Sequence, residues 1–172
     1  NANPGNLINS FTSFVVVRSI KKTLDNNILI GGALSNVNAA LGVKDLLMCS
    51  ASGILNTAFN SNHSFVSSGY GGSIYTLAVQ PYSSDASGYR ILVGGIWSYY
   101  STISDAKNMV RLKSDGTFDN LFYTNAVTGK NFKASDIKIE TIGSSSYILV
   151  GGPSTNYGGI TGRDYLVRFD KD

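Results

Sequence analysis

The word "ILIGG" occupies residues 28–32, and "ILVGG" occupies residues 91–95 and again residues 148–152. The first isoleucines of the three copies are separated by 63 and 57 residues. Self-similarity at such a period is typical of proteins that stack or ring copies of one structural unit. The word therefore predicts three structural repeats within the 172 residues of the chain.

A second word keeps the same register in every copy. Leu46, Met109 and Leu166 each lie 18 residues beyond the isoleucine that opens the glycine word. The second word reads "LLMCSASG" at 46–53, "MVRLKSDG" at 109–116 and "LVRFDKD" at 166–172. Two words held at one spacing three times make a chance resemblance implausible.

Two further segments complete the repeat. A third word follows the second, as "GILNTAF" at 53–59 and "GTFDNLF" at 116–122, and a degenerate copy, "GNLINSF", lies at 5–11. A fourth segment precedes each glycine word at 13–19, 73–80 and 135–141, and apolar and polar residues alternate in the second and third copies. Alternation predicts half-buried strands. We therefore expect an all-β chain of three tandem four-stranded repeats.

Each glycine word ends in a pair of glycines. Because glycine inside a strand costs conformational entropy, its repeated use indicates a bulge or a close approach of another backbone. A phosphate-binding loop is the functional alternative, but such a loop must open a helix. The segments that follow, "ALSNVNAA", "IWSYYSTIS" and "PSTNYGGIT", do not start like helices. Asp115-Gly116 predicts a tight turn between two strands.

The composition supports an all-β fold and excludes some partners. Only 15% of the residues are charged, and Ser, Asn, Gly and Tyr replace the usual Glu and Lys. The net charge is +3, and Arg18, Lys21 and Lys22 form the only tight basic cluster. A nucleic-acid-binding protein would show a basic face, so we expect no nucleic-acid partner. The longest apolar runs are too short to span a membrane, so we expect no membrane insertion.

The order of the words resembles the delta-60 repeat family, a β-propeller-like repeat of bacterial and phage surface proteins. Repeat two is the most faithful copy, with Val110-Arg111-Leu112, Asp115-Gly116, Asp119 and Phe122 after the glycine word. Repeat one departs, because Met48 replaces the arginine and Asn56 replaces the aspartate. The resemblance implies β-propeller blades, part of a larger ring, and carries no catalytic residues.

The words also predict the boundaries of the repeats. We expect one β-propeller-type array over 1–172, with repeat one at 12–64, repeat two at 65–122 and repeat three at 123–172. Repeat three then lacks its last strand, and residues 1–11 hold a strand that completes a neighbouring blade. Three blades are too few for an ordinary ring, since propellers use about four to eight. A second copy, or further repeats of the same parent chain, would close it.

Residues with reactive side chains are few. His63 is the only histidine, in a polar turn where we expect it to be exposed, and Cys49 is the only cysteine, with apolar neighbours that predict burial. One of each excludes a metal site with several His or Cys ligands. A Cys–His dyad is formally possible, and a Ser–His–Asp triad would have to use His63, but no serine lies in a G-x-S-x-G elbow. The carboxylates, none of which stands out as half of a catalytic pair, are Asp85, Asp105, Asp119, Asp136, Glu140 and Asp164. We expect no catalytic residue, no metal and no cofactor.

Binding is the better prediction. Loops that vary on a fixed scaffold often carry function. The segments after the second and third glycine words hold the ligand-binding candidates Trp97, Tyr99, Tyr100, Asn156 and Tyr157. Such side chains can stack on sugar rings or anchor a protein partner. The alternative for Trp97 is a core position.

These observations predict a non-enzymatic structural or adhesive module of a virion tail or fibre or of a bacterial surface protein. It would be extracellular and act on a protein partner, on further repeats of the parent chain or on surface glycans. A lectin-like carbohydrate-binding domain is the first alternative, and a glycan-cleaving enzyme on the same scaffold is the second.

Overall fold

The chain is seen in a computed structural model, which describes residues 16–34, 45–66, 72–101, 103, 106–122, 133–143, 145–153 and 165–170. The three glycine words lie in strands, as the sequence predicts, and none of them is helical. The described strands are β1 (Val16–Lys22), β2 (Ile28–Ala33), β3 (Leu46–Cys49), β4 (Phe65–Val66), β5 (Ser73–Pro81), β6 (Tyr89–Ile96), β7 (Tyr99–Tyr100), β8 (Met109–Lys113), β9 (Asp136–Ile142), β10 (Ser145–Gly151) and β11 (Leu166–Asp170). Two short helices, α1 (Thr57–Ser61) and α2 (Asn120–Phe122), follow β3 and β8.

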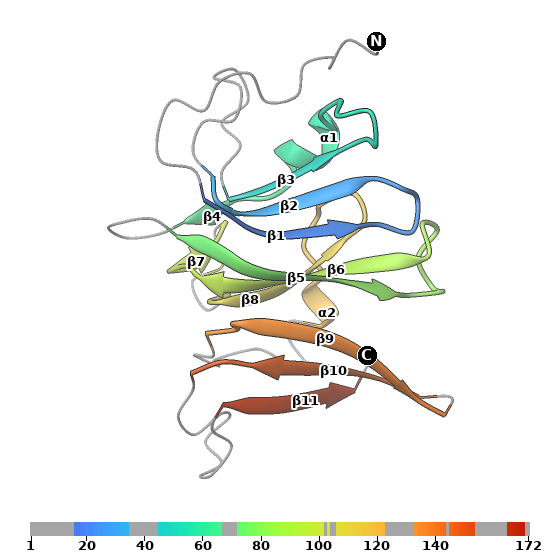
Figure 1. Cartoon of the computed structure of the whole chain (residues 1–172), viewed down its shortest axis with the longest axis vertical. Coiled ribbons are helices and arrows are strands. Elements are labelled where there is room, and N and C mark those ends of the chain that lie inside the picture. The colour runs from blue at the N-terminus through green and yellow to red at the C-terminus, as the bar shows by residue number, and fades with distance from the viewer. Residues whose placement is uncertain are drawn as a thin grey trace.

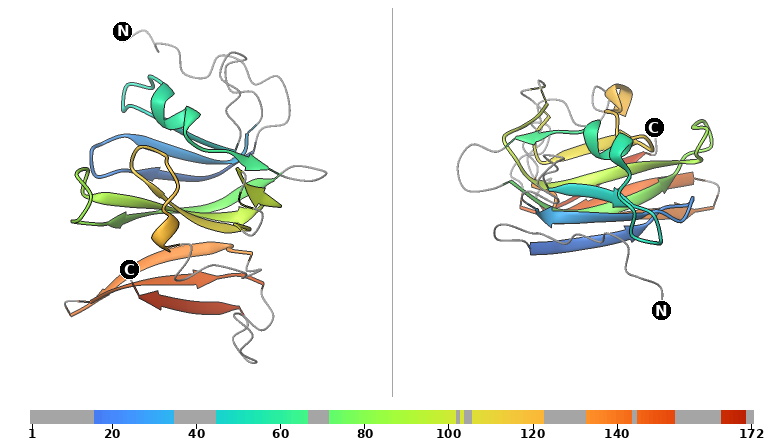
Figure 2. Two further views of the ribbon diagram at one scale, coloured as in Figure 1. Left: turned by 180° about the vertical axis from the view of Figure 1, so that it is seen from behind. Right: turned by 90° about the horizontal axis from the view of Figure 1, so that it is seen from above.

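The strands of each repeat form one antiparallel sheet. The first sheet has the order β1-β2-β3, the second β5-β6-β8 and the third β9-β10-β11, while β4 and β7 make a separate pair. The three sheets follow one another along the long axis of the molecule (Figure 1), and this succession is also clear from behind (Figure 2). Contacts between successive sheets run mainly through β5 and β9. The described part of the chain is therefore predominantly β, as predicted.

Strand pairing places the three repeats in one register. Ile28 pairs with Cys49, Ile91 with Leu112 and Ile148 with Phe169. The next residue of each word, Leu29, Leu92 or Leu149, faces Met48, Arg111 or Arg168. The prediction that the words occupy equivalent places, with these leucines on a common face, is confirmed.

The second glycine of each pair lies against backbone. A Cβ on Gly32 would stand 1.9 Å from the Val16 carbonyl oxygen, and one on Gly95 would stand 2.1 Å from that of Ser73. A Cβ on Gly152 would stand 2.0 Å from the Lys133 oxygen. The expected close backbone approach is thus present in all three repeats. A break in the pairing register marks a bulge beside the first two pairs.

The same glycines bond to a residue with a left-handed backbone. The amides of Gly32, Gly95 and Gly152 each donate at 2.9 Å to the carbonyl oxygen of the residue before the second word. These acceptor residues have positive φ angles of 67°, 65° and 73°, and they are Asp45, Asn108 and Tyr165. Asp and Asn tolerate this conformation, whereas a bulky residue such as Tyr165 is strained in it.

The third word is not the fourth strand that the alternation of the repeat suggested. Leu55 and Phe118 each make a single bridge to the preceding strand, and a helix follows at once. The Phe59 amide donates to the Asn56 side chain at 3.0 Å, and the Phe122 amide approaches Asp119 at 3.4 Å. Asn and Asp are favoured N-cap residues because their oxygens accept the unsatisfied amides of a first turn. Three strands and a short helix therefore replace the four strands expected in repeats one and two.

The core lies between the sheets. One large apolar cluster joins all three, with Leu29, Leu77, Leu92, Val93 and Ile148 each fully buried. A smaller cluster of Leu34, Leu47 and Cys49 lies apart from it, on the first sheet. Cys49 is buried and free, as the sequence predicts.

Replacement of Gly95 by alanine tests the backbone contact. Because the new Cβ would lie 2.1 Å from the Ser73 oxygen, β5 and β6 must separate. We expect Gly95→Ala to lower the free energy of unfolding by about 2 kcal/mol or more, as overpacking commonly does. Gly151→Ala is the matched control, since the nearest atom to its Cβ is 3.8 Å away. Urea denaturation at low protein concentration measures both, and equal stability of the two variants contradicts the contact.

Candidate functional site

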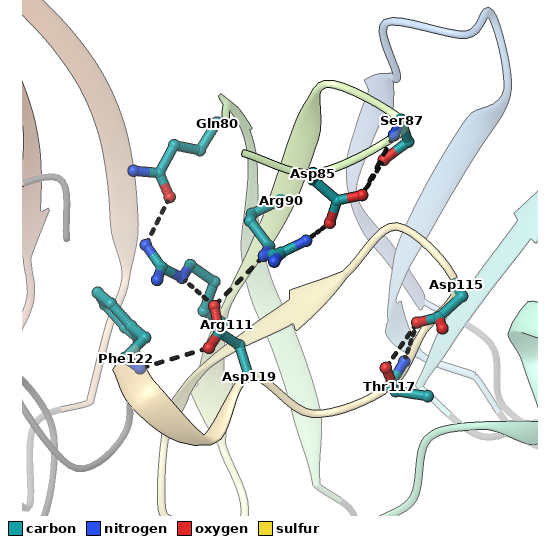
Figure 3. A network of polar contacts seen from close by, with 9 residues as sticks. All are labelled: Gln80, Asp85, Ser87, Arg90, Arg111, Asp115, Thr117, Asp119 and Phe122. Carbon is teal, nitrogen blue, oxygen red and sulfur yellow. Dashed lines mark hydrogen bonds and ion pairs between the residues drawn. The ribbon is translucent and has the colours of Figure 1, made fainter. Parts of the chain in front are cut away.

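Asp119 and Phe122 of the repeat-two motif converge on Arg111 in β8 (Figure 3). The Arg111 Nε donates to Asp119 Oδ2 at 2.7 Å, and Nη1 donates to Gln80 Oε1 at 3.2 Å. The guanidinium also lies over the Phe122 ring, 4.3 Å from its centroid. Arg111 is only 2% exposed and Asp119 only 5%. These motif side chains hold the second sheet to α2 and are shielded from any ligand in solvent.

The same two positions interact in repeat one through different chemistry. Met48 and Asn56 are the counterparts of Arg111 and Asp119, and the Asn56 amide approaches the Met48 sulfur at 3.6 Å. Both repeats share a backbone hydrogen bond at these positions. The Asn56 backbone amide donates to the Met48 carbonyl at 2.9 Å, and the Asp119 backbone amide donates to the Arg111 carbonyl at 3.0 Å. The substitutions in repeat one are therefore paired, and they replace a buried ion pair by a weaker polar contact.

Arg90 extends the network toward the surface. It forms an ion pair with Asp85, whose Oδ1 also accepts from the Ser87 hydroxyl at 2.9 Å. Its Nε lies 3.4 Å from Asp119 Oδ2. Sequence reasoning missed Gln80 and Arg90. Both lie in ordinary strand positions, and only the pairing of β5, β6 and β8 brings them beside the motif.

The Asp115-Gly116 turn has the expected form and an additional contact. Gly116 has a φ of 87°, and the Thr117 amide donates to Asp115 Oδ1 at 2.9 Å. A Cβ at Gly116 would lie 2.7 Å from the Phe59 carbonyl, and the Asn62 side-chain amide donates to the Asp115 carbonyl at 2.9 Å. The turn therefore docks repeat two on α1 of repeat one.

Of the predicted binding residues, Trp97 and Tyr100 point inward. Trp97 is 3% exposed and donates from its indole nitrogen to the Ala106 carbonyl at 2.9 Å, so it has the core position that was its alternative. Tyr100 is 2% exposed, and its ring stacks on Phe118 at 5.2 Å. Phe65 packs edge-on against both side chains, 5.0 Å from Trp97 and 5.1 Å from Tyr100. Burial raises the pKa of the Tyr100 phenol.

Tyr99 differs from its neighbours. It is 38% exposed, because successive residues of β7 point to opposite sides and Tyr100 takes the inner one. Asn156 and Tyr157 lie outside the described residues. Of the predicted binding residues that the structure describes, only Tyr99 is exposed, and the binding role of all five stays a prediction.

His63 is not the exposed histidine that its polar neighbours suggested. Its ring lies 5.2 Å from that of Phe59 and 5.8 Å from that of Phe65. Both ring nitrogens are shielded from solvent and lack a hydrogen-bond partner within the described residues. Burial lowers the pKa of His63 from 6.5 to about 4. The expectation was wrong because aromatic residues on either side, four before and two after, close over the turn.

The remaining reactive groups form no cluster in the part of the chain that can be seen. Asp85 and Asp119 are bound to arginines, while Asp105 and Asp164 lie outside the described residues. Among the residues that the structure describes, no group of three or more His, Cys, Asp or Glu could hold a metal ion. No helix of these residues is long and apolar enough to cross a membrane.

One family model matches the chain. It is described as a domain of unknown function (DUF5122) beta-propeller, and it matches residues 90–122, from the start of β6 to the end of α2. The match covers about a fifth of the chain and includes the Arg111–Asp119 pair and the Gly116 turn. No curated protein and no solved structure matches. The match supports a β-propeller-like family for this chain.

Removal of one partner of the buried ion pair should be costly. Asp119→Ala leaves the Arg111 guanidinium buried without its carboxylate, which typically costs about 3–5 kcal/mol. Arg111→Met with Asp119→Asn copies the pair that repeat one already uses, so we expect this double variant to unfold at a free energy closer to that of the unaltered protein. Urea denaturation compares the three chains. A double variant less stable than Asp119→Ala would show that the pairing is not the reason for the motif.

Acid should weaken the fold through His63. Its folded pKa, about 4, lies below the ordinary value of 6.5, so the folded state resists protonation. The stability it contributes is present above pH 6.5 and falls by up to about 1.4 kcal/mol per pH unit between 6.5 and 4. For Asp25 and Asp115, burial raises the pKa, but hydrogen bonds lower it by more, so the pKa of each lies below its ordinary value. The stability that these two carboxylates contribute is therefore lost at a lower pH than that of His63.

We expect His63→Phe to flatten the dependence of the unfolding free energy on pH between 6.5 and 4.5. Ser64→Ala, at the exposed neighbouring position, serves as the control and should keep the slope of the unaltered chain. Unfolding by urea at several pH values measures it. A slope that survives in His63→Phe contradicts the assignment.

Proposed function

We propose that this chain is a non-enzymatic structural or adhesive module of the delta-60 type, a β-propeller-like repeat at a virion or bacterial surface. The observation that carries the proposal is the use of the repeat motif. Arg111 is buried and donates to the buried side chains of Asp119 and Gln80, so the polar motif of repeat two serves the scaffold. The propeller family match over residues 90–122 supports the same assignment.

Contacts with partners then depend on side chains that vary between repeats. Tyr99 is a candidate because it is exposed on β7, next to Tyr100, whose ring packs against Phe65 and Phe118. An aromatic ring held by a rigid support loses little entropy on binding. A lectin-like activity is the second candidate function, and the same tyrosine would carry it by stacking on a sugar ring.

Binding to glycans and to cells tests the proposal. A glycan array and a cell-binding assay should give binding that Tyr99→Ala weakens at least fivefold, with little change in melting temperature. Tyr165→Asn is the matched control, since it removes another exposed tyrosine, and Asn suits the left-handed backbone there. Equal loss in both variants would place the contact elsewhere, and no binding in either assay would favour a purely structural module.

Tyr100 should not be mutated with Tyr99 in that experiment. Its ring is buried, so Tyr100→Ala should lower stability by about 3–5 kcal/mol, in the range of large aromatic truncations. Tyr100→Phe should be neutral or stabilising, because the buried hydroxyl has no partner within the described residues. Thermal denaturation measures both. A strongly destabilised Tyr100→Phe variant would reveal a hydrogen bond to that hydroxyl.

Hydrolysis of oligosaccharides by the protein would contradict the non-enzymatic proposal. Asp136→Asn is the informative variant, because Asp136 is exposed on β9. Loss of any such activity in this variant would favour a glycan-cleaving enzyme.

A further inference from the structure

Successive sheets contact each other in the same way twice. A Cβ on Gly31 would lie 2.7 Å from Ile74 Cγ2 and 3.1 Å from Leu77 Cδ1 of the second sheet. A Cβ on Gly94 would lie 2.6 Å from Ala134 Cβ and 3.0 Å from Ile137 Cδ1 of the third sheet. Gly31 and Gly94 thus each leave room for two apolar side chains of the next repeat, which lie on its inner strand or, for Ala134, just before it.

A hydrogen bond repeats at the same place. The Leu77 amide donates to Ser19 Oγ at 3.2 Å, and the Ile137 amide donates to Thr76 Oγ1 at 3.2 Å. Ser19 and Thr76 pair with Gly31 and Gly94 respectively, so they occupy one register position. An inner strand at the edge of its sheet has amides without a ladder partner, and the neighbouring repeat supplies an acceptor for one of them.

The outer face of the first sheet is one half of this contact. By register, Val17 and Ile20 of β1 correspond to Ile74 and Leu77 of β5. Val17 is 46% exposed and Ile20 60% exposed, whereas Ile74 and Leu77 are fully buried against the first sheet. We call this surface, Val17 and Ile20 with the outer side of β2, the head face.

The outer face of the third sheet is the other half. Gly151 pairs with Asp136 as Gly94 pairs with Thr76, and among the described residues no atom lies nearer than 3.8 Å to a Cβ built on Gly151. Leu166 is 66% exposed, although its counterpart Met109 is 1% exposed. We call this surface, Asp136, Gly151 and Leu166, the tail face.

We propose that the tail face of one chain binds the head face of a second copy, head to tail, with Gly151 against Val17 and Ile20. The second copy is the occupant that the geometry favours. Its head face presents branched apolar residues at the register positions that face the first glycine inside the chain. By the same register, the Ile20 amide corresponds to the Leu77 and Ile137 amides, each of which donates to a hydroxyl of the preceding sheet. Asp136 stands at the same register position as Ser19 and Thr76, and within its own chain its Oδ1 accepts from the Thr76 hydroxyl at 3.4 Å and from the Ile137 amide at 3.0 Å. The proposal develops the contact with further repeats in the function proposed above.

Each face can be blocked without disturbing the chain itself. A Cβ at Gly31 or Gly94 would lie about 3 Å from the next repeat, whereas Gly151→Ala meets, among the described residues, only the Tyr165 carbonyl oxygen at an ordinary 3.8 Å. Ile20→Glu puts a charge on a residue that is 60% exposed. Leu24→Glu and Ser145→Ala are the controls, because they make comparable changes at a turn and at the other end of β10.

Sedimentation velocity of the full chain over a range of concentrations tests the proposal. We expect species of two or more chains, at least tenfold weaker association in Gly151→Ala and in Ile20→Glu, and no change in the controls. A mixture of the two blocked variants should associate again, because one keeps its head face and the other its tail face.

A chain that stays monomeric throughout, a blocked variant that associates normally, or a mixture that fails to associate would each overturn the proposal. Tyr99→Ala separates it from the adhesive function, since that variant should associate like the unaltered chain even where it loses surface binding.

Discussion

The fold depends on what the paired glycines allow at the end of each middle strand. At the second glycine, the backbone at or just before the start of the preceding strand lies where a Cβ would stand. At the first glycine, side chains of the next repeat take that place in the first two pairs. A side chain at the second position would push two paired strands apart, and one at Gly31 or Gly94 would push two sheets apart. Since the pair occurs at the same register in every repeat, one local constraint determines both the shape of a sheet and the spacing between sheets.

Around this constraint, each repeat closes with its own polar contact. In repeat two the contact is a buried ion pair between Arg111 and Asp119, and in repeat one it is the softer pair of Met48 and Asn56. A buried ion pair gains little net free energy over apolar residues, but it is costly to break. The ion pair fixes the position of α2 against its sheet. In repeat one, α1 is held in the same way by the backbone hydrogen bond that repeats one and two share.

Much of this organisation could be predicted from the sequence, because the repeated words have a fixed spacing and the strands have period two. The register of Ile28, Ile91 and Ile148 followed from the spacing alone. The helices were missed, although Asn and Asp are favoured N-cap residues. The side chains of Asn56 and Asp119 face the amides of the residues three positions later, Phe59 and Phe122. His63 was misplaced because its polar immediate neighbours obscure the aromatic residues four before and two after it. The burial of Tyr100 depends on the distant rings of Phe65 and Phe118, which local polarity does not reveal. The contact of Gln80 with Arg111 depends on the pairing of strands and has no local signal.

The central claim is that the first glycine of a pair, Gly31 or Gly94, is the place where the next sheet packs. Nuclear Overhauser effects between the glycine Hα protons and methyl groups of the next sheet test this proximity directly. With specifically labelled methyl groups at low protein concentration, the account predicts cross-peaks from the Gly31 Hα protons to methyl groups of Ile74 and Leu77. It also predicts cross-peaks from the Gly94 Hα protons to the δ-methyl of Ile137, and no methyl cross-peak from another sheet to Gly151. Absence of the Gly31 and Gly94 cross-peaks in the folded protein would contradict the account.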